Sequence, residues 1–382
     1  MEQKHQKHAK LARPQLGFFG RNEWAIIGTP CGNLQAIALS LTKQLTPSYT
    51  LAYVDADHHA ATDAEENFLG EKVLVYTDKI AYHQFQLSAK LDRYQYRTYF
   101  NDRDLVLVNG NHFIAENQLV VIDPRKYDSL QRKLDRLSNV QAFILTEGIT
   151  EIPAFLIEHL PQATEVPVFK ATELDQVADL LLSKMRAALP PLYGLVLAGG
   201  KSQRMGQAKG MLDYHGKPQQ EFMGDVLDKF CAKTFLSCRP NQIISPDCAY
   251  PLLPDSFEGL GPFGGIASAF RAYPNHAWLV VACDLPLLDE ATLQQLCQAR
   301  NPSKVATCFN SPTSEFPEPL ITIWEPRSYP VLLQFLAQGY SCPRKVLINA
   351  DIEALDVVDA KALMNVNRPE EYEQVKALLE KK

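Results

Sequence analysis

The 382-residue chain lacks several features that would place it in special classes of protein. It has no run of about 18 apolar residues, so it contains no predicted membrane span. Its 8 cysteines form no CxxC pair, so structural zinc is not expected. Basic residues (38) are fewer than acidic ones (44), whereas a nucleic-acid-binding protein usually has an excess of basic residues. The 46% hydrophobic content excludes intrinsic disorder. We therefore expect a folded cytoplasmic protein with reduced thiols and with neither nucleic acid nor membrane as its partner.

The first residues are locally basic but do not resemble a targeting sequence. Lysine, arginine and histidine recur between residues 1 and 13. An apolar core, which a secretory signal requires, is missing from this run. We expect residues 1–19 to form a flexible, solvated tail.

Short apolar runs alternate with helical patterns in both halves of the chain, which predicts two α/β domains with mainly parallel sheets. The dipeptide Pro190-Pro191 interrupts the alternation and predicts a linker between domains 20–188 and 192–382. In the first half, strands are expected at 24–27, 50–54, 72–76, 105–108, 119–122 and 142–145, and helices at 34–44, 84–91, 129–136 and 173–187. In the second half, strands are expected at 193–197, 234–237, 277–282 and 320–324, and helices at 219–230, 264–272, 290–300 and 370–381.

A glycine-containing loop follows the first strand of the second half. Residues 197–209 read LAGGKSQRMGQAK. Glycines let the backbone approach a ligand closely, and successive backbone N–H groups can bind an anion. Arg204 and Lys209 supply the positive charge that a triphosphate needs. Gly199-Gly200 alone is equally compatible with a tight turn. The two cations behind it favour a phosphate site that is neither a dinucleotide fingerprint nor a P-loop.

A carboxylate ends the apolar strand 277–282. Asp284 follows Cys283 and precedes a turn fixed by Pro286. Ligands of open α/β sheets bind at the carboxyl ends of strands, and carboxylate oxygens suit Mg²⁺. The alternative is a helix cap, but Asp289 suits that role better because the helical pattern starts at Glu290. We predict Asp284 to be a magnesium ligand.

Two further segments carry weaker signals. Residues 255–266 read DSFEGLGPFGGI, where Asp255 could accept hydrogen bonds from a base or ribose. An ordinary surface loop is the alternative. Residues 365–372 read NVNRPEEY, and alone they indicate the start of a helix with acidic residues in its first turn.

Together these four blocks resemble the nucleotidyltransferase family that includes molybdenum cofactor guanylyltransferase. The family pattern is LAGGxSxRMGxxK, D-x(n)-GPxxGI, CDxP and NxNxPEE, and residues 193–382 carry all four blocks in order. The resemblance implies a three-layer, Rossmann-like nucleotidyltransferase domain. It also implies that Leu197, Ala198, Gly199 and Gly200 line the nucleotide and that Lys209 and Arg204 act on its phosphates. Asp255 would contact the nucleoside, and Asp284 would bind Mg²⁺ and GTP.

The resemblance implies transfer of GMP from GTP to molybdopterin, with release of pyrophosphate, and a molybdoenzyme client or a biosynthetic partner protein. Two departures bear on the choice of base. The family often has Asp before the loop lysine, where this chain has Ala208. It also often has Ser/Asn-x-Asn-Arg after its second strand, where this chain has residues 236–239 (LSCR). A transferase using CTP or a sugar phosphate, or a non-catalytic scaffold for cofactor delivery, is the alternative.

The first half has a strand and turn where a P-loop would lie. After Gly28 or Gly32, neither reading frame supplies the Lys-Ser/Thr pair of that motif. Residues 53–59 (YVDADHH) and 104–110 (DLVLVNG) resemble the P-loop GTP-binding adaptor of molybdenum cofactor biosynthesis, with Asn109 in place of an acidic residue. We expect a three-layer, P-loop-like domain that binds a partner or cofactor without hydrolysing GTP. Neighbouring His58 and His59 favour a polar loop over a metal site, because adjacent strand residues face opposite sides.

Overall fold

The computed structural model describes residues 18–56, 74–87, 91, 95–200, 208–242 and 248–379. It divides into two compact units, Met1–Ala187 and Ala188–Lys382. These units are the N-terminal and the C-terminal domain.

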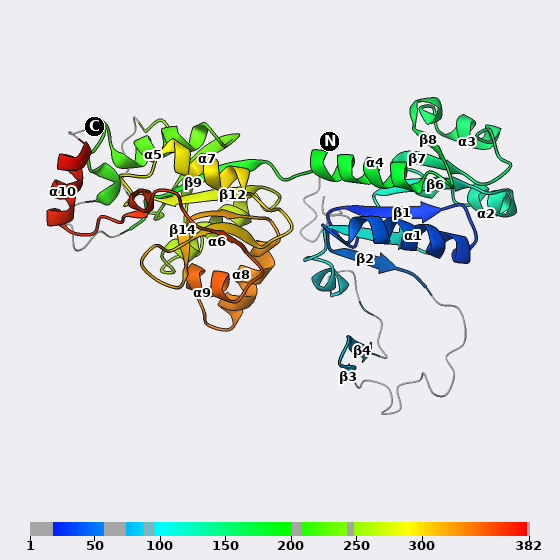
Figure 1. Cartoon of the computed structure of the whole chain (residues 1–382), viewed down its shortest axis with the longest axis horizontal. Coiled ribbons are helices and arrows are strands. Elements are labelled where there is room, and N and C mark those ends of the chain that lie inside the picture. The colour runs from blue at the N-terminus through cyan, green and yellow to red at the C-terminus, as the bar shows by residue number, and fades with distance from the viewer. Residues whose placement is uncertain are drawn as a thin grey trace, which may run out of the picture. The chain divides into compact units, whose positions relative to one another are not determined.

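A six-stranded sheet forms the centre of the N-terminal domain (Figure 1). Its order is β2-β5-β1-β6-β7-β8, and every neighbouring pair is parallel. The main elements are β1 (Glu23–Ile27), α1 (Cys31–Leu45), β2 (Leu51–Val54), β3 (Leu74–Asp78), β4 (His83–Leu87), β5 (Leu105–Asn109), β6 (Asn117–Ile122), α2 (Tyr127–Gln131), β7 (Val140–Leu145), α3 (Ala154–His159), β8 (Val168–Lys170) and α4 (Leu174–Ala187).

Helices cover both faces of this sheet because side chains alternate along each strand. Ile26 packs in one cluster with side chains of α1 and α4, whereas Ile27 packs in another with side chains of α2 and α3. The central strands β1, β5 and β6 are buried over almost their full length, as expected for a parallel sheet covered on both sides. The predicted three-layer arrangement is confirmed for this domain.

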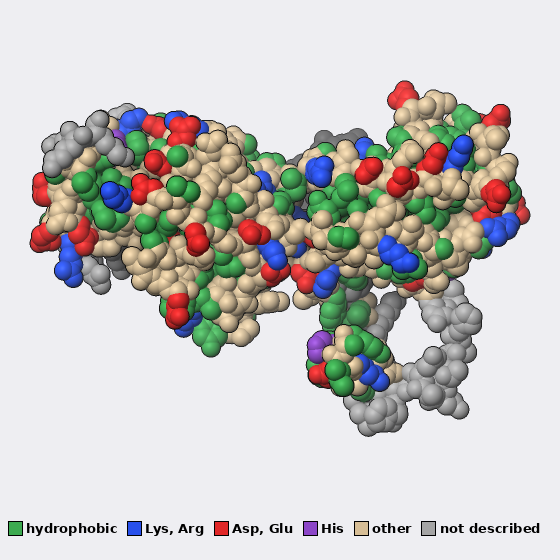
Figure 2. Space-filling view, viewed as in Figure 1, with side chains coloured by type: hydrophobic (Ala, Val, Ile, Leu, Met, Phe, Trp, Pro, Cys, Tyr) green, Lys and Arg blue, Asp and Glu red, His purple; other side chains and the backbone are tan. Residues whose placement is uncertain are grey.

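One predicted helix of this domain is wrong. The pattern at 84–91 predicts a helix, but residues 83–87 form strand β4, which pairs antiparallel with β3 from Leu74 to Asp78. Residues 88–90 of that expectation lie outside the described part of the chain. The hairpin is a separate two-stranded sheet, so the strand expected near 72–76 does not join the main sheet. Hydrophobic side chains of the hairpin are exposed (Figure 2). The segment is therefore held by backbone pairing between its two strands and not by the burial of one face of a helix.

A seven-stranded sheet forms the centre of the C-terminal domain, in the order β11-β10-β9-β12-β14-β13-β15 (Figure 1). The first four strands are parallel, whereas β14 pairs antiparallel with both β12 and β13. The main elements are β9 (Leu192–Leu197), α5 (Gln219–Asp228), β10 (Lys233–Cys238), β11 (Leu252–Pro254), α6 (Pro262–Ala272), β12 (Ala277–Ala282), α7 (Glu290–Gln298), β13 (Ala306–Asn310), β14 (Pro317–Trp324), α8 (Ser328–Ala337), α9 (Pro343–Ile348), β15 (Glu353–Leu355) and α10 (Pro369–Leu379).

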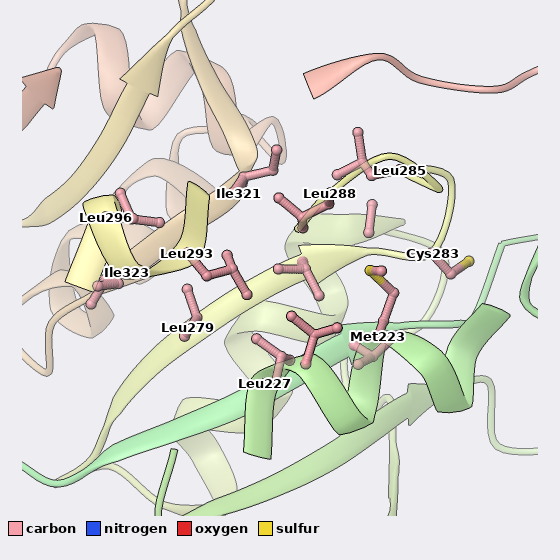
Figure 3. Packing of buried hydrophobic residues seen from close by; sticks show 14 of the residues in the cluster. Met223, Leu227, Leu279, Cys283, Leu285, Leu288, Leu293, Leu296, Ile321 and Ile323 are labelled. Atoms are coloured by element: carbon pink, nitrogen blue, oxygen red, sulfur yellow. The ribbon is translucent and has the colours of Figure 1, made fainter. Parts of the chain in front are cut away.

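This domain also has three layers. Met223 and Leu227 of α5 and Leu293 of α7 pack on Leu279 of β12 (Figure 3). Side chains of α6, α8 and α9 pack with Trp278 on the opposite face. Successive residues of one strand thus pack into hydrophobic cores on opposite faces of the sheet, which confirms the second predicted α/β/α domain. In the part of the chain that the structure describes, no helix is both long and apolar enough to cross a membrane.

Candidate functional site

A pocket of about 1130 Å³ lies at the carboxyl edge of the parallel strands of the C-terminal domain. Strands β11, β10, β9 and β12 run in the same direction, so the loops that follow them meet at one edge. This volume is slightly above the range of roughly 300–1,000 Å³ that is typical of small-molecule sites. Among its lining residues are all the predicted site residues that the structure describes: Leu197, Ala198, Gly199, Gly200, Lys209, Asp255 and Asp284. Predicted Arg204 lies in 201–207, outside the described residues.

Lys209 and Asp284 meet in this pocket although they are 75 residues apart in sequence. Lys209 begins a short 3-10 helix, Lys209–Met211, and its Nζ lies 3.1 Å from Oδ2 of Asp284. The two side chains are 16% and 20% exposed, so solvent screens this pair less than a surface ion pair. A cation and a carboxylate are therefore held together where a charged ligand would bind.

The second oxygen of Asp284 has an unusual environment. Oδ1 is buried and has no hydrogen-bond partner among the described residues. A buried acceptor without a partner costs free energy, and a bound cation would satisfy it. Mg²⁺ commonly binds through one or two carboxylates together with substrate phosphates. Asp284 fits such an ion. The described residues contain no group of three or more His, Cys, Asp or Glu side chains that could hold a metal, so oxygens of the substrate and water would complete its shell.

Asn367 completes the cluster around Lys209, and sequence reasoning missed its place in the site. Its Oδ1 accepts a hydrogen bond from Lys209 Nζ at 2.6 Å. The segment is fixed by Glu371, whose carboxylate accepts the backbone N–H groups of Asn367 and Arg368. Val366 N donates to Asp284 O at 2.8 Å, which joins the segment to the loop after β12. The NxNxPEE block contained the signal, but read alone it indicated only the start of α10.

The other end of the pocket is lined by Asp255 and Ser237. Ser237 Oγ donates a hydrogen bond to Oδ1 of Asp255 at 2.9 Å. Burial raises the pKa of Asp255, and Glu258 adds to the rise while the Ser237 hydrogen bond opposes it. A Cβ atom on Gly199 would lie 3.6 Å from Oδ2 of Asp255, so the glycine turn passes close to this carboxylate.

The glycine-rich segment 255–266, which leads into the first turn of α6, is more than a surface loop. A Cβ on Gly264 would lie 2.3 Å from the carbonyl oxygen of Phe257, and one on Gly265 would lie 2.7 Å from Ser237 Oγ. Gly261 has φ of 57°, a conformation that favours glycine. The glycines therefore let α6 pack directly against the strand ends that hold Asp255.

Gln242 is a second residue that sequence reasoning missed. Its Nε2 donates to Ala198 O at 3.0 Å, and its Oε1 accepts the backbone N–H of Arg239 at 3.2 Å. The side chain thus ties the loop after β10 to the glycine turn after β9. This is the region where the chain departs from the family pattern, and Arg239 lines the pocket there.

The carboxyl edge of the N-terminal sheet is built differently. Leu34, in the P-loop-like frame, is fully buried in the core, and Gln35 Nε2 donates to Asp55 at 2.9 Å. Asn109 Nδ2 donates to the other oxygen of Asp55 at 2.6 Å, a contact that an acidic residue could not make without repulsion. Thr29 Oγ1 donates to Asp123. These side chains are engaged with one another, and the predicted loop residues 57–59 lie outside the described part of the chain.

The two domains of the chain are similar to different known proteins. The MobA-like NTP transferase domain family matches residues 194–354. A molybdenum cofactor guanylyltransferase of Pseudomonas putida is 32% identical over 190 residues, which cover 49% of this chain and 98% of that protein. The chain belongs to the MobA-like NTP transferase family. Its C-terminal half carries this nucleotidyltransferase domain, which confirms the family resemblance of the sequence.

Two further similarities concern this MobA-like protein. A molybdenum cofactor biosynthesis bifunctional protein of Synechocystis is 37% identical over 186 residues, or 48% of this chain and 54% of that protein, so the chain spans about half the length of that relative. The N-terminal region is similar in structure to molybdopterin-guanine biosynthesis protein B, with 14% identity, a TM-score of 0.31, and coverage of 43% of this chain and 99% of that one.

Proposed function

We propose that the C-terminal domain transfers GMP from GTP to molybdopterin and releases pyrophosphate. The observation that carries the proposal is the cluster of Lys209, Asn367 and Asp284 beside the glycine turn after β9, in which one Asp284 oxygen has no hydrogen-bond partner among the described residues. The family of the C-terminal domain supports nucleotidyl transfer as the class of reaction. Relatives named guanylyltransferase favour GTP as the nucleotide donor.

The chemistry is a displacement at phosphorus. The terminal phosphate of molybdopterin attacks the α-phosphorus of GTP in line, and the bond to pyrophosphate breaks. The protein forms no covalent intermediate, so its contribution is positioning and charge stabilisation. Lys209 neutralises charge that develops on the phosphate oxygens, and the backbone N–H groups of Gly199 and Gly200 orient the phosphates. Arg204 is proposed to act with Lys209.

Asp284 is the proposed magnesium ligand. Mg²⁺, when bound, supplies Lewis-acid stabilisation of the negatively charged phosphates. Lys209 then exchanges its Asp284 contact for a phosphate oxygen, while Asn367 still holds its Nζ. Asp255 is proposed to accept a hydrogen bond from the ribose or the base, and Gln242 holds the adjoining loop in place.

The test is a reaction of the purified chain with Mg²⁺, molybdopterin and each of GTP, CTP and ATP. We expect pyrophosphate and a dinucleotide product with GTP, and slower turnover with the other nucleotides. Preference for CTP would contradict the choice of guanine. Cofactor binding without pyrophosphate release from any nucleotide would instead support a delivery scaffold.

For the N-terminal domain we propose binding of a partner protein or of the cofactor without GTP hydrolysis. Support comes from the engaged side chains at its sheet edge, where buried Leu34 and hydrogen-bonded Gln35 stand in the place of the P-loop cation and hydroxyl. The full chain, given GTP and Mg²⁺ without molybdopterin, should release no inorganic phosphate. Clear magnesium-dependent release of phosphate would overturn this proposal.

A further inference from the structure

A cysteine lies at the carboxyl edge of the N-terminal sheet, where three polar side chains converge on it. Cys31 is the first residue of the 15-residue helix α1 and is partly exposed. Its Sγ lies 3.5 Å from Nε2 of His112. Two side-chain amides also point at the sulfur, with Asn109 Nδ2 at 3.7 Å and Asn111 Nδ2 at 4.0 Å. The start of a helix, an imidazole and two side-chain amides thus surround one partly exposed sulfur.

The turn that carries His112 is held tightly against the strand that leads to Cys31. A Cβ on Gly110 would lie 2.8 Å from Cβ of Ile27 and 3.0 Å from the carbonyl oxygen of Ile26, so only glycine permits this approach of β1 and the turn. His112 N donates to Asn109 O at 3.1 Å. Lys133 Nζ donates to Asn111 O at 2.8 Å and fixes the turn from outside. The thiol and the imidazole are therefore brought together by the backbone.

A carboxylate orients the amide that faces the sulfur. Asp55 Oδ1 accepts from Asn109 Nδ2 at 2.6 Å, and Asp55 Oδ2 accepts from Tyr53 OH and Gln35 Nε2. Burial alone would raise the pKa of Asp55, but these hydrogen bonds outweigh it and lower the pKa. The ionised carboxylate keeps the Asn109 N–H groups directed between itself and Cys31. A nucleophile within reach of a base, with neighbouring groups that fix the geometry, is the arrangement of nucleophilic sites.

Most other cysteines of the chain lie where burial disfavours the thiolate. Burial raises the pKa of the thiols of Cys231, Cys238, Cys283, Cys297 and Cys308.

Cys342 offers a matched comparison. It is exposed and also precedes a helix, α9, yet no imidazole is hydrogen-bonded to it among the described residues.

We propose that Cys31 and His112 form a reactive thiol–imidazole pair that undergoes thiol–disulfide exchange with small disulfides. His112 Nε2 accepts the thiol proton, and Sγ of Cys31 attacks one sulfur of the disulfide. A new S–S bond forms to Cys31 as the original S–S bond breaks. The departing thiolate takes up the proton from His112. The small disulfide is thus the oxidant, and the products are a mixed disulfide on Cys31 and one free small thiol.

The test follows modification of the full-length protein by the small aromatic disulfide dithiodipyridine at neutral pH. Release of the thiopyridone gives the total rate, and peptide mass mapping assigns each modified cysteine. We expect Cys31 to react about tenfold faster than Cys342. His112→Ala should slow Cys31 to the rate of Cys342, and Cys31→Ser should abolish the fast phase.

A control variant is His159→Ala, which removes a histidine of the same domain that contacts Leu134 O. It should change neither rate. His112→Gln keeps a polar side chain without a base and serves if His112→Ala fails to fold, as judged by circular dichroism. Equal rates for Cys31 and Cys342 in the unmodified protein would overturn the proposal. A fast Cys31 in folded His112→Ala or His112→Gln would overturn it as well. The site lies outside the transferase pocket, so the outcome is independent of the proposed transferase activity.

Discussion

The two domains of this protein present the same kind of sheet edge but different chemistry. In the C-terminal domain, the edge opens into a pocket where Lys209 and Asp284 are paired and one Asp284 oxygen has no partner among the described residues. In the N-terminal domain, Asp55 is hydrogen-bonded to Gln35, Tyr53 and Asn109 at the corresponding edge. An α/β architecture therefore supplies a place for a ligand but does not determine which ligand binds there. The charged side chains that can still contact a ligand at the sheet edge determine which ligand binds.

The largest expected effect comes from removing either member of the charged pair in the transferase pocket. Lys209→Ala and Asp284→Ala should each lower kcat/KM for GTP by about 100-fold or more, because each removes a preorganised electrostatic group. Steady-state pyrophosphate release measures the effect. Lys217→Ala is the matched control, since it removes an exposed ion pair with Asp225 in the same domain. Near-normal activity of Asp284→Ala would rule out its role as the metal ligand.

A smaller loss is expected at Asn367. Asn367→Ala removes the hydrogen bond to Lys209 Nζ, and hydrogen bonds to charged groups contribute roughly 1.5–3 kcal/mol. We expect kcat/KM to fall about tenfold while the domain stays folded. Asn349→Ala, which removes an exposed side chain that donates to Lys345 O, provides the comparison. If the two variants are equally active, Asn367 does not position the lysine.

Replacing a glycine by alanine should change the stability of the two domains in different ways. Gly264→Ala places a Cβ 2.3 Å from Phe257 O, and we expect a cost of about 1–3 kcal/mol from overpacking. Gly32, in the P-loop-like frame, lies in α1, and no atom of the described residues beyond its chain neighbours and its own helix backbone lies within 4 Å of its Cβ position. Gly32→Ala should therefore be neutral or raise stability by up to about 1 kcal/mol. Thermal unfolding of the two variants tests the contrast, and a loss of stability in Gly32→Ala would contradict it.

Two aspartates should respond to pH in opposite ways. Burial raises the pKa of Asp255, so ionising it at neutral pH opposes folding. Asp255→Asn should therefore raise the Tm at neutral pH by about 2 °C, and the gain should vanish as the pH falls below the ordinary pKa of an aspartate.

Asp55 has a lowered pKa because its hydrogen bonds outweigh the effect of burial, so its ionised form stabilises the fold. Asp55→Asn should lower the Tm at neutral pH by a similar amount, and the loss should fade as the pH falls through the folded pKa of Asp55. Melting curves of both variants across acidic and neutral pH test the signs. A shift of the same sign in both variants would contradict the assigned environments.

Sequence patterns correctly predicted the features that depend on residues close together in the chain. The alternation of strands and helices gave two α/β domains, and the glycine turn and Asp284 were found as strand-end signals. The Lys209–Asn367 contact spans 158 residues and depends on how the C-terminal segment packs, so no local pattern contains it. Likewise, 84–87 forms a strand because it pairs with β3, which overrides its helical pattern. Short strands such as β11 and β15, with 3 residues each, carry too little periodicity to predict.

The most direct test of the account is a crystal structure of the full chain with GTP and Mg²⁺. We predict the triphosphate against the turn at Gly199 and Gly200, with the ion on Asp284 and Lys209 Nζ on a phosphate oxygen. A nucleotide bound instead at the edge formed by Asp55 and Asn109, with the C-terminal pocket empty, would contradict the account.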